Sequence, residues 1–112
     1  QTNPEQTAEI ARLFITQAIA HLPELIKRDE AVALDVLYLI HQQEAQANTP
    51  FCDERGATML HMLAKMGWRN GVAFWSIHHP EHKTAVDHDG LQPLNYAQRA
   101  GHQIIAIFLG LA

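Results

Sequence analysis

The stretch Asp53-Glu-Arg-Gly-Ala-Thr-Met-Leu-His-Met-Leu-Ala-Lys-Met-Gly67 decides the fold, because the stretch Asp87-His-Asp-Gly-Leu-Gln-Pro-Leu-Asn-Tyr-Ala-Gln-Arg-Ala-Gly101 repeats its pattern. Four identities share one offset of 34 residues: Asp53 and Asp87, Gly56 and Gly90, Leu60 and Leu94, Gly67 and Gly101. Self-similarity at a fixed period is typical of repeat architectures. The pattern therefore predicts two copies of one structural unit, over residues 53–86 and 87–112.

Each copy reads as a turn, a helix, a glycine and a second helix. The first glycine permits the positive φ of a tight turn, and the second stands where a helix C-cap favours the left-handed conformation. Thr58 can cap the first helix of one copy, while Pro93 occupies the first helical position of the other. The residues expected to point inward from the first helices are Leu60, Leu63, Ala64, Leu94 and Ala97. Those expected to anchor the second helices are Val72, Trp75, Ile105, Ala106 and Leu109.

This pattern resembles the ankyrin repeat, a unit of about 33 residues that opens with Asp-x-x-Gly-x-Thr-Pro-Leu-His. The matching residues are Asp53, Gly56, Thr58, Leu60, His61, Ala64 and Gly67 in the first copy, and Asp87, Gly90, Pro93, Leu94, Ala97, Gly101 and His102 in the second. The departures are Met59, Trp68, Gln92 and Asn95. The resemblance implies an all-α, ankyrin-type stack of helical repeats with short finger loops.

Residues 1–52 carry no Asp-x-x-Gly opening, and they are expected to form either a degenerate first repeat or an unrelated helical cap. A helix from about Pro4 to His21 is predicted, with Ile10, Leu13, Phe14, Ala18 and Leu22 as its apolar stripe. Pro23 is expected to end or kink this helix, with a short helix over 24–27 after it. Asp29 can cap the next helix, which buries Ala33, Val36, Leu37 and Ile40.

Composition excludes several classes of protein. The 112 residues carry a formal net charge of −4, so they lack the basic excess that nucleic-acid binding requires. No apolar run approaches the roughly 20 residues of a membrane-spanning helix. The start lacks both a signal peptide and an initiator Met, so we expect a processed chain or a piece of a longer protein. We expect the protein in the cytoplasm, or delivered into a host cell if it is part of a bacterial effector. The lone Cys52 forms no intramolecular disulfide.

The C-terminal segment is unusually apolar, with Ile104, Ile105, Ile107, Phe108, Leu109 and Leu111. A terminal capping repeat normally has a polar outer face. Two interpretations stay open: further repeats or a partner, including a second copy of the chain, cover this helix, or the helix is well buried within the chain itself.

Histidines and Cys52 offer the candidates for chemistry. His78, His79 and His82, with His88 nearby, could ligate a metal, but Pro80 interrupts them and no Cys or carboxylate spacing completes a known site. A solvated His-rich loop is the alternative. The family implies a structural role for His61, and the acidic neighbour of Cys52 disfavours a thiolate. We therefore expect no enzyme activity, no cofactor and no metal.

Two tryptophans belong to the region of the second helix of the first copy. Trp75 falls at an inward position and is expected in the core. Trp68 follows the C-cap glycine, with Arg69 beside it, and is either an exposed binding hot spot or packed against the next repeat.

The resemblance implies a module that binds a protein partner through its concave face and finger loops. The contact positions it assigns are Glu54, Arg55, Ala57, Lys65, Met66, His88, Asp89, Leu91, Arg99 and Ala100. Neither nucleic acid nor a membrane is expected as a partner. The alternatives are a His-rich metal-responsive module, or the targeting domain of a larger secreted bacterial effector enzyme.

Overall fold

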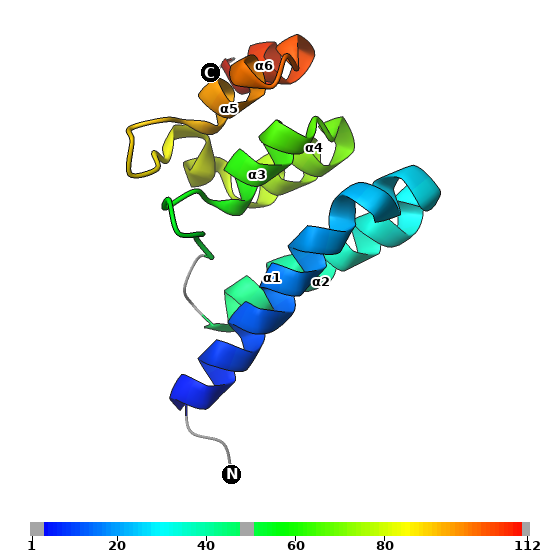
Figure 1. Cartoon of the computed structure of the whole chain (residues 1–112), viewed down its shortest axis with the longest axis vertical. Helices are drawn as coiled ribbons and strands as arrows, with labels where there is room; N and C mark the ends of the chain where they lie inside the picture. The colour runs from blue at the N-terminus through cyan, green and yellow to red at the C-terminus, as the bar shows by residue number, and fades with distance from the viewer. Residues whose placement is uncertain (1–3, 48–50, 111–112) are drawn as a thin grey trace. The chain divides into compact units, whose positions relative to one another are not determined.

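The computed structural model describes residues 4–47 and 51–110. Within those ranges the chain forms six α-helices and one 3-10 helix, without any strand (Figure 1). The expected all-α class is confirmed. The chain divides into two compact units, Gln1–Phe51 and Cys52–Ala112, and each is described by itself.

The first unit is a pair of helices, α1 (Pro4–Arg28) and α2 (Glu30–Ala47), which pack against each other (Figure 1). Asp29 separates them, and its Oδ1 accepts a hydrogen bond from the Val32 N–H at 3.4 Å, as expected of an N-cap. The side chains buried in this unit belong to Ile15, Leu22, Ala33, Leu37, Ile40 and Glu44.

The prediction that Pro23 ends the first helix is wrong. α1 continues through Pro23 to Arg28, so the separate short helix over 24–27 does not exist. A proline removes one N–H from the helical ladder, which leaves one carbonyl of the preceding turn without its usual donor. The packing of α1 against α2 outweighs this loss, since most helical stability in proteins comes from the packed apolar face.

The predicted apolar stripe of the first helix is also wrong over its N-terminal half. Ile10, Leu13 and Phe14 are 60%, 58% and 42% exposed, whereas Ile15 and Leu22 are buried. Leu22, the last residue of the predicted stripe, is buried as expected, but in the N-terminal half the buried position is Ile15 instead of Phe14. α1 has 25 residues against 18 in α2, so part of α1 has no partner helix alongside it.

The second unit contains α3 (Met59–Met66), α4 (Arg69–His78), η1 (Pro80–Thr84), α5 (Pro93–Arg99) and α6 (Gln103–Gly110). α3 contacts α4, and α5 contacts α6 in the same way. The two helix pairs meet where α3 packs against α5 (Figure 1). Leu94 is only half-buried, whereas the other residues expected inside belong to the core: Leu60, Leu63, Ala64, Val72, Trp75, Ala97, Ile105, Ala106 and Leu109. The core also contains Ala57, Met59 and Trp68.

The hydrogen bonds that open α3 recur 34 residues later at α5. The Thr58 N–H donates to Nδ1 of His61 at 3.0 Å, and the Gln92 N–H donates to Oδ1 of Asn95 at 2.9 Å. Asn95 thus makes the same local bond as His61, although the residue type differs. The remaining ring nitrogen of His61, Nε2, lies 2.8 Å from the Leu91 carbonyl and donates to it, which ties α3 to the turn before α5.

Two glycines allow the helix pairs to approach closely. Gly56 has a φ of +80°, and a Cβ there would lie 2.8 Å from Cδ2 of His88. Gly67 has a φ of +79°, and a Cβ there would collide with the imidazole of His102. Larger residues would therefore meet both backbone strain and a steric clash at these positions.

The C-terminal helix α6 is buried on one side only. Ile105, Ala106 and Leu109 are buried, while Ile104 and Ile107 are 64% and 65% exposed. The interpretation that this helix is well buried therefore fails for half of its surface. Trp68 is 4% exposed and its ring lies against Gly71, so the interpretation as an exposed hot spot is wrong.

Candidate functional site

Two aspartate turns shape one side of the second unit. Oδ1 of Asp53 accepts hydrogen bonds from the N–H groups of Arg55 and Ala57, both at 2.9 Å. Oδ1 of Asp87 accepts from Asp89 and Leu91, again both at 2.9 Å. Each carboxylate therefore fixes the backbone of its own turn, in the manner of an Asx-turn. The turns hold their exposed side chains at defined positions beside α3 and α5.

A pocket of about 240 Å³ lies between these turns and the ends of α3 and α5. We call it the turn pocket; it is lined by Arg55, Lys65, Asp87, Asp89, Leu91, Tyr96, Arg99 and Ala100. Six of the ten residues expected to contact a partner are among them: Arg55, Lys65, Asp89, Leu91, Arg99 and Ala100. The structure therefore brings residues separated by up to 45 positions in sequence into one concave surface.

The other four expected residues do not line the turn pocket. Ala57 is fully buried, so it cannot touch a partner while the unit is folded. Glu54 and His88 are exposed and Met66 is half-buried, but all three lie outside the pocket. His88 instead lies against the Gly56 backbone.

Sequence reasoning missed Tyr96 and gave Asp87 only a turn role. The Tyr96 hydroxyl donates to Oδ2 of Asp87 at 2.6 Å, so both carboxylate oxygens are hydrogen-bonded. This bond, helped by the N–H donors of the turn, holds the pKa of Asp87 below its usual range. Burial, and then the bond to Asp87, raises the pKa of Tyr96 to about 12. Near neutral pH the pair stays a carboxylate and a neutral phenol, which suits binding better than proton transfer.

Three cationic side chains in the turn pocket carry no ion pair. Arg55, Lys65 and Arg99 make no salt bridge or side-chain hydrogen bond to any of the residues that the structure describes. Their charges therefore stay available to a ligand. The carboxylate of Asp89, which also lines the pocket, likewise has no partner among the residues that the structure describes.

The histidine segment forms a separate cluster around η1. His79, Glu81 and His82 bring their ligand atoms within 4.8 Å of one another. Oε1 of Glu81 lies 3.6 Å from Nδ1 of His79 and 3.9 Å from Nε2 of His82. His78 instead contacts Phe74, so the structure replaces one expected histidine with a carboxylate. The solvated-loop interpretation is wrong for His82, which is 6% exposed.

The hydrogen bond made by His82 weighs against metal binding there. The Trp75 indole N–H, which can only donate, bonds to Nδ1 of His82 at 3.0 Å. The ring proton of neutral His82 is therefore on Nε2, the nitrogen that faces Glu81. A metal at Nε2 would move this proton to Nδ1, where it would oppose the indole N–H. The arrangement fits a buried packing cluster better than a ligand set, and burial lowers the pKa of both His79 and His82.

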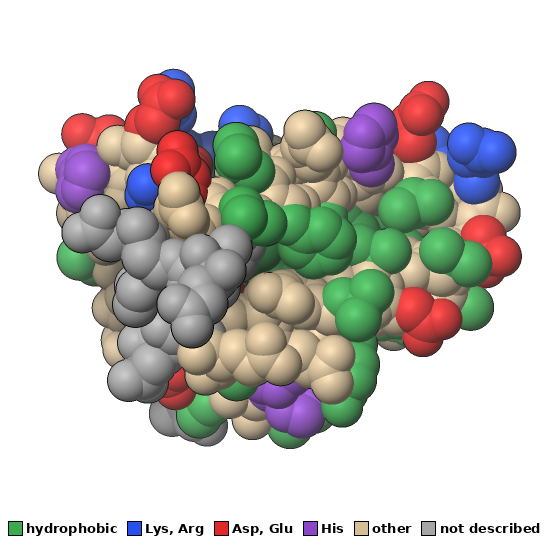
Figure 2. Space-filling view, turned by 90° about the horizontal axis from the view of Figure 1, so that it is seen from below, with side chains coloured by type: hydrophobic (Ala, Val, Ile, Leu, Met, Phe, Trp, Pro, Cys, Tyr) green, Lys and Arg blue, Asp and Glu red, His purple; other side chains and the backbone are tan. Residues whose placement is uncertain are grey.

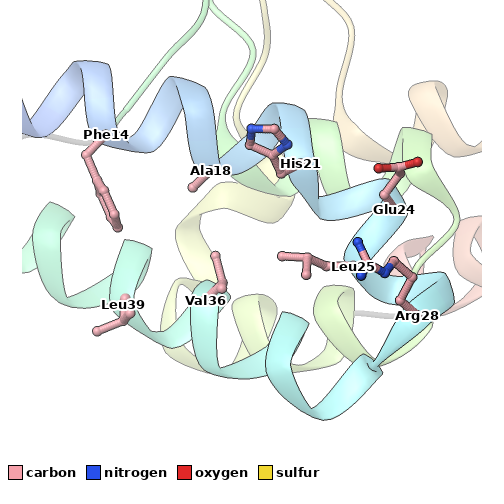
Figure 3. A pocket seen from close by; sticks show the side chains of 8 residues that line it. All are labelled: Phe14, Ala18, His21, Glu24, Leu25, Arg28, Val36 and Leu39. Carbon is pink, nitrogen blue, oxygen red and sulfur yellow. The ribbon is translucent and has the colours of Figure 1, made fainter.

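A third candidate surface is an apolar groove of about 370 Å³ between α1 and α2. Phe14, Ala18 and Leu25 line it from α1, and Val36 and Leu39 from α2 (Figure 3). Glu24 and Arg28 lie at one end. Hydrophobic side chains also form a band across the face shown in Figure 2. Of the stripe that the sequence placed in the core, Phe14 and Ala18 line this groove.

Comparison of the chain with family models, curated proteins and solved structures finds no significant match. Among the described residues, none of the helices combines the length and apolar character needed to cross a membrane. The function must therefore be argued from the geometry of the chain itself.

Proposed function

We propose that the second unit is a pair of ankyrin-type repeats that binds a protein partner through the turn pocket. The observation that carries this proposal is the pocket itself, since six of the contact positions implied by the resemblance line one cavity. The recurrence of the aspartate turns and of the helix-opening hydrogen bonds supports the repeat interpretation.

The turn pocket suits a rigid binding surface. Its turns are tied to their own backbones by the aspartates, and His61 links α3 to the second turn. A surface that is ordered before binding loses less conformational entropy on association. The pocket also mixes unpaired charges with apolar walls from Leu91 and Ala100, a combination typical of specific protein interfaces.

Site-specific photo-crosslinking tests this function. A benzoylphenylalanine at position 100, in the turn pocket, is expected to crosslink a partner protein in cells that make the full chain. The same group at position 77, which is 75% exposed on α4 and outside the pocket, is the matched control. Arg55→Glu and Arg99→Glu are expected to reduce the crosslink without changing the helical circular dichroism spectrum. Equal crosslinking from positions 77 and 100 would place the binding face elsewhere.

The second candidate function is a metal-responsive module, favoured by the proximity of His79, Glu81 and His82. Calorimetric titration of the chain with zinc chloride decides it. Heat of binding at micromolar zinc that disappears in Glu81→Gln would support the module. Absence of heat would remove it and leave the cluster a packing feature.

A further inference from the structure

The distribution of charge singles out the turn pocket within an acidic chain. Residues 1–51 contain three Lys and Arg against seven Asp and Glu, whereas residues 52–112 contain five of each. Three of the five cations of the second unit, Arg55, Lys65 and Arg99, line this one pocket. A concentration of unpaired cations in one concavity favours an anionic ligand.

Neither of the two acidic side chains of the pocket, Asp87 and Asp89, forms an ion pair with these cations. Asp87 already accepts hydrogen bonds from two backbone N–H groups and from Tyr96, so its oxygens are committed to the turn. Asp89 is exposed at the pocket and forms no ion pair with Arg55, Lys65 or Arg99. The pocket therefore keeps a surplus of one positive charge, and its three cationic side chains are exposed to solvent.

The size and walls of the pocket fit a side chain. Its volume of about 240 Å³ lies below the roughly 300–1,000 Å³ of small-molecule sites. Leu91, Ala100 and the ring of Tyr96 supply apolar wall, against which a short aliphatic stem can pack. Arginine guanidinium groups bind planar carboxylates through paired hydrogen bonds.

We propose that the turn pocket receives an Asp or Glu side chain of the partner protein, whose carboxylate is bound by Arg55, Arg99 and Lys65. This inference rests on the proposed function, because it names the chemistry of the residue that the binding face recognises. A single negative charge neutralises the pocket's surplus of one positive charge, whereas a phosphate dianion would leave the filled pocket with a net negative charge.

The test is selection of peptides from a phage-displayed random library on the immobilised full chain. The expected result is enrichment of Asp and Glu at one position of the selected peptides. The double variant Arg55→Gln with Arg99→Gln is expected to lose this enrichment. Arg69→Gln is the matched control, because Arg69 is exposed on α4 and does not line the pocket. Ala100→Trp, which fills the pocket, is expected to abolish selection.

Fluorescence anisotropy with one selected peptide then measures the effect of the charge. Replacing its acidic residue by the amide is expected to weaken binding about tenfold or more, the usual effect of losing a charge-assisted hydrogen bond. Raising the salt from about 0.1 M to about 1 M is expected to weaken the acidic peptide more than its amide variant.

The outcomes separate the two proposals. If peptides are selected and Ala100→Trp blocks them, but no acidic position emerges, the pocket binds protein and the carboxylate inference is overturned. If a phosphoserine at that position binds more tightly than glutamate, the inference is likewise overturned in favour of phosphate. If wild-type chain selects no peptide, or Ala100→Trp changes nothing, the proposed function fails and the inference fails with it.

Discussion

The hydrogen bond between Trp75 and His82 couples the core of the second unit to the protonation of a histidine. His82 is buried, accepts from the Trp75 indole at 3.0 Å and stacks on His79 with ring centroids 4.9 Å apart. Protonation at Nδ1 would turn this acceptor into a donor opposite the indole N–H. Burial lowers the pKa of His82, while Glu81 opposes that shift without cancelling it. The neutral ring is therefore part of the folded structure.

A pH dependence of stability follows for this residue. The unfolded chain binds a proton at His82 near pH 6.5, whereas the folded chain binds it only at lower pH. The contribution of His82 to the free energy of unfolding should therefore be fully present above pH 6.5 and be lost as the pH drops below it. Buried Glu44, whose pKa burial raises to about 7, changes stability in the opposite direction over this range, but it does so equally in the wild-type chain and in a His82 variant. His82→Gln keeps an acceptor for Trp75 but does not titrate, so its stability should fall less steeply. Urea unfolding across this range measures the difference.

The matched control for this prediction is the exposed Ile77 on α4. Ile77→Gln should leave the pH dependence of the wild-type chain unchanged, because Ile77 is 75% exposed and the substitution removes no titratable group. His79, whose pKa burial also lowers, remains in His82→Gln and should account for a residual slope. A wild-type slope that persists in full when both His79 and His82 are replaced by Gln would contradict this assignment.

The residues that could be predicted from the sequence are those whose role is local. The turn aspartates, the Thr58 cap and the glycine C-cap of α3 depend on bonds within five residues. The hydrogen bonds of Tyr96 and His82 were not predicted, because their partners, Asp87 and Trp75, are nine and seven positions away and meet them only after folding. Tyr96 lies three and four positions before Arg99 and Ala100, a spacing that puts the three residues on one face of a helix. This spacing was the one signal in the sequence that Tyr96 belongs to the same surface.

At the scale of elements, α1 illustrates how tertiary packing overrides a local rule. A proline in a helix interior costs up to about 3 kcal/mol relative to alanine, which justified ending the helix at Pro23. The sequence does not reveal that α2 packs alongside α1 both before and after Pro23. It also does not reveal that Leu22, next to the proline, is fully buried. The period of the apolar residues was predictable, but which of two adjacent stripes packs inward depends on the partner helix.

Pro23→Ala should therefore stabilise the chain. Pro23 is exposed, so the substitution leaves no cavity, and it restores an N–H donor in the middle of α1. The expected gain is about 1–3 kcal/mol in the free energy of unfolding, measured by urea denaturation followed by circular dichroism. Thr16→Ala, also exposed on α1, controls for general effects of a better helix former. A loss of stability in Pro23→Ala would mean that the proline ring itself contributes packing.

At the scale of the whole molecule, the two units carry different charge. The net charge of −4 belongs entirely to residues 1–51, while residues 52–112 are neutral and contain the turn pocket. A ligand with an acidic side chain is thus attracted by the pocket and repelled by the chain as a whole. Short-range contacts in the pocket mainly set how long a ligand stays, whereas the net charge acts on its approach.

Neutralising exposed acidic residues of the first unit should accelerate association of the acidic peptide. In the double variant Glu9→Gln with Asp35→Asn, both positions are exposed and belong to α1 and α2, so the pocket is untouched. Because the screening length of exposed charges shortens from about 30 Å at 0.01 M salt to about 10 Å at 0.1 M salt, the effect should be larger at low ionic strength than near physiological salt. Stopped-flow anisotropy should give an association rate a few fold higher at about 0.01 M salt, with an unchanged dissociation rate. Gln17→Asn, which changes no charge, is the control. If the charge variant instead changed the dissociation rate as much as the association rate, the repulsion would act within the bound complex and this prediction would be contradicted.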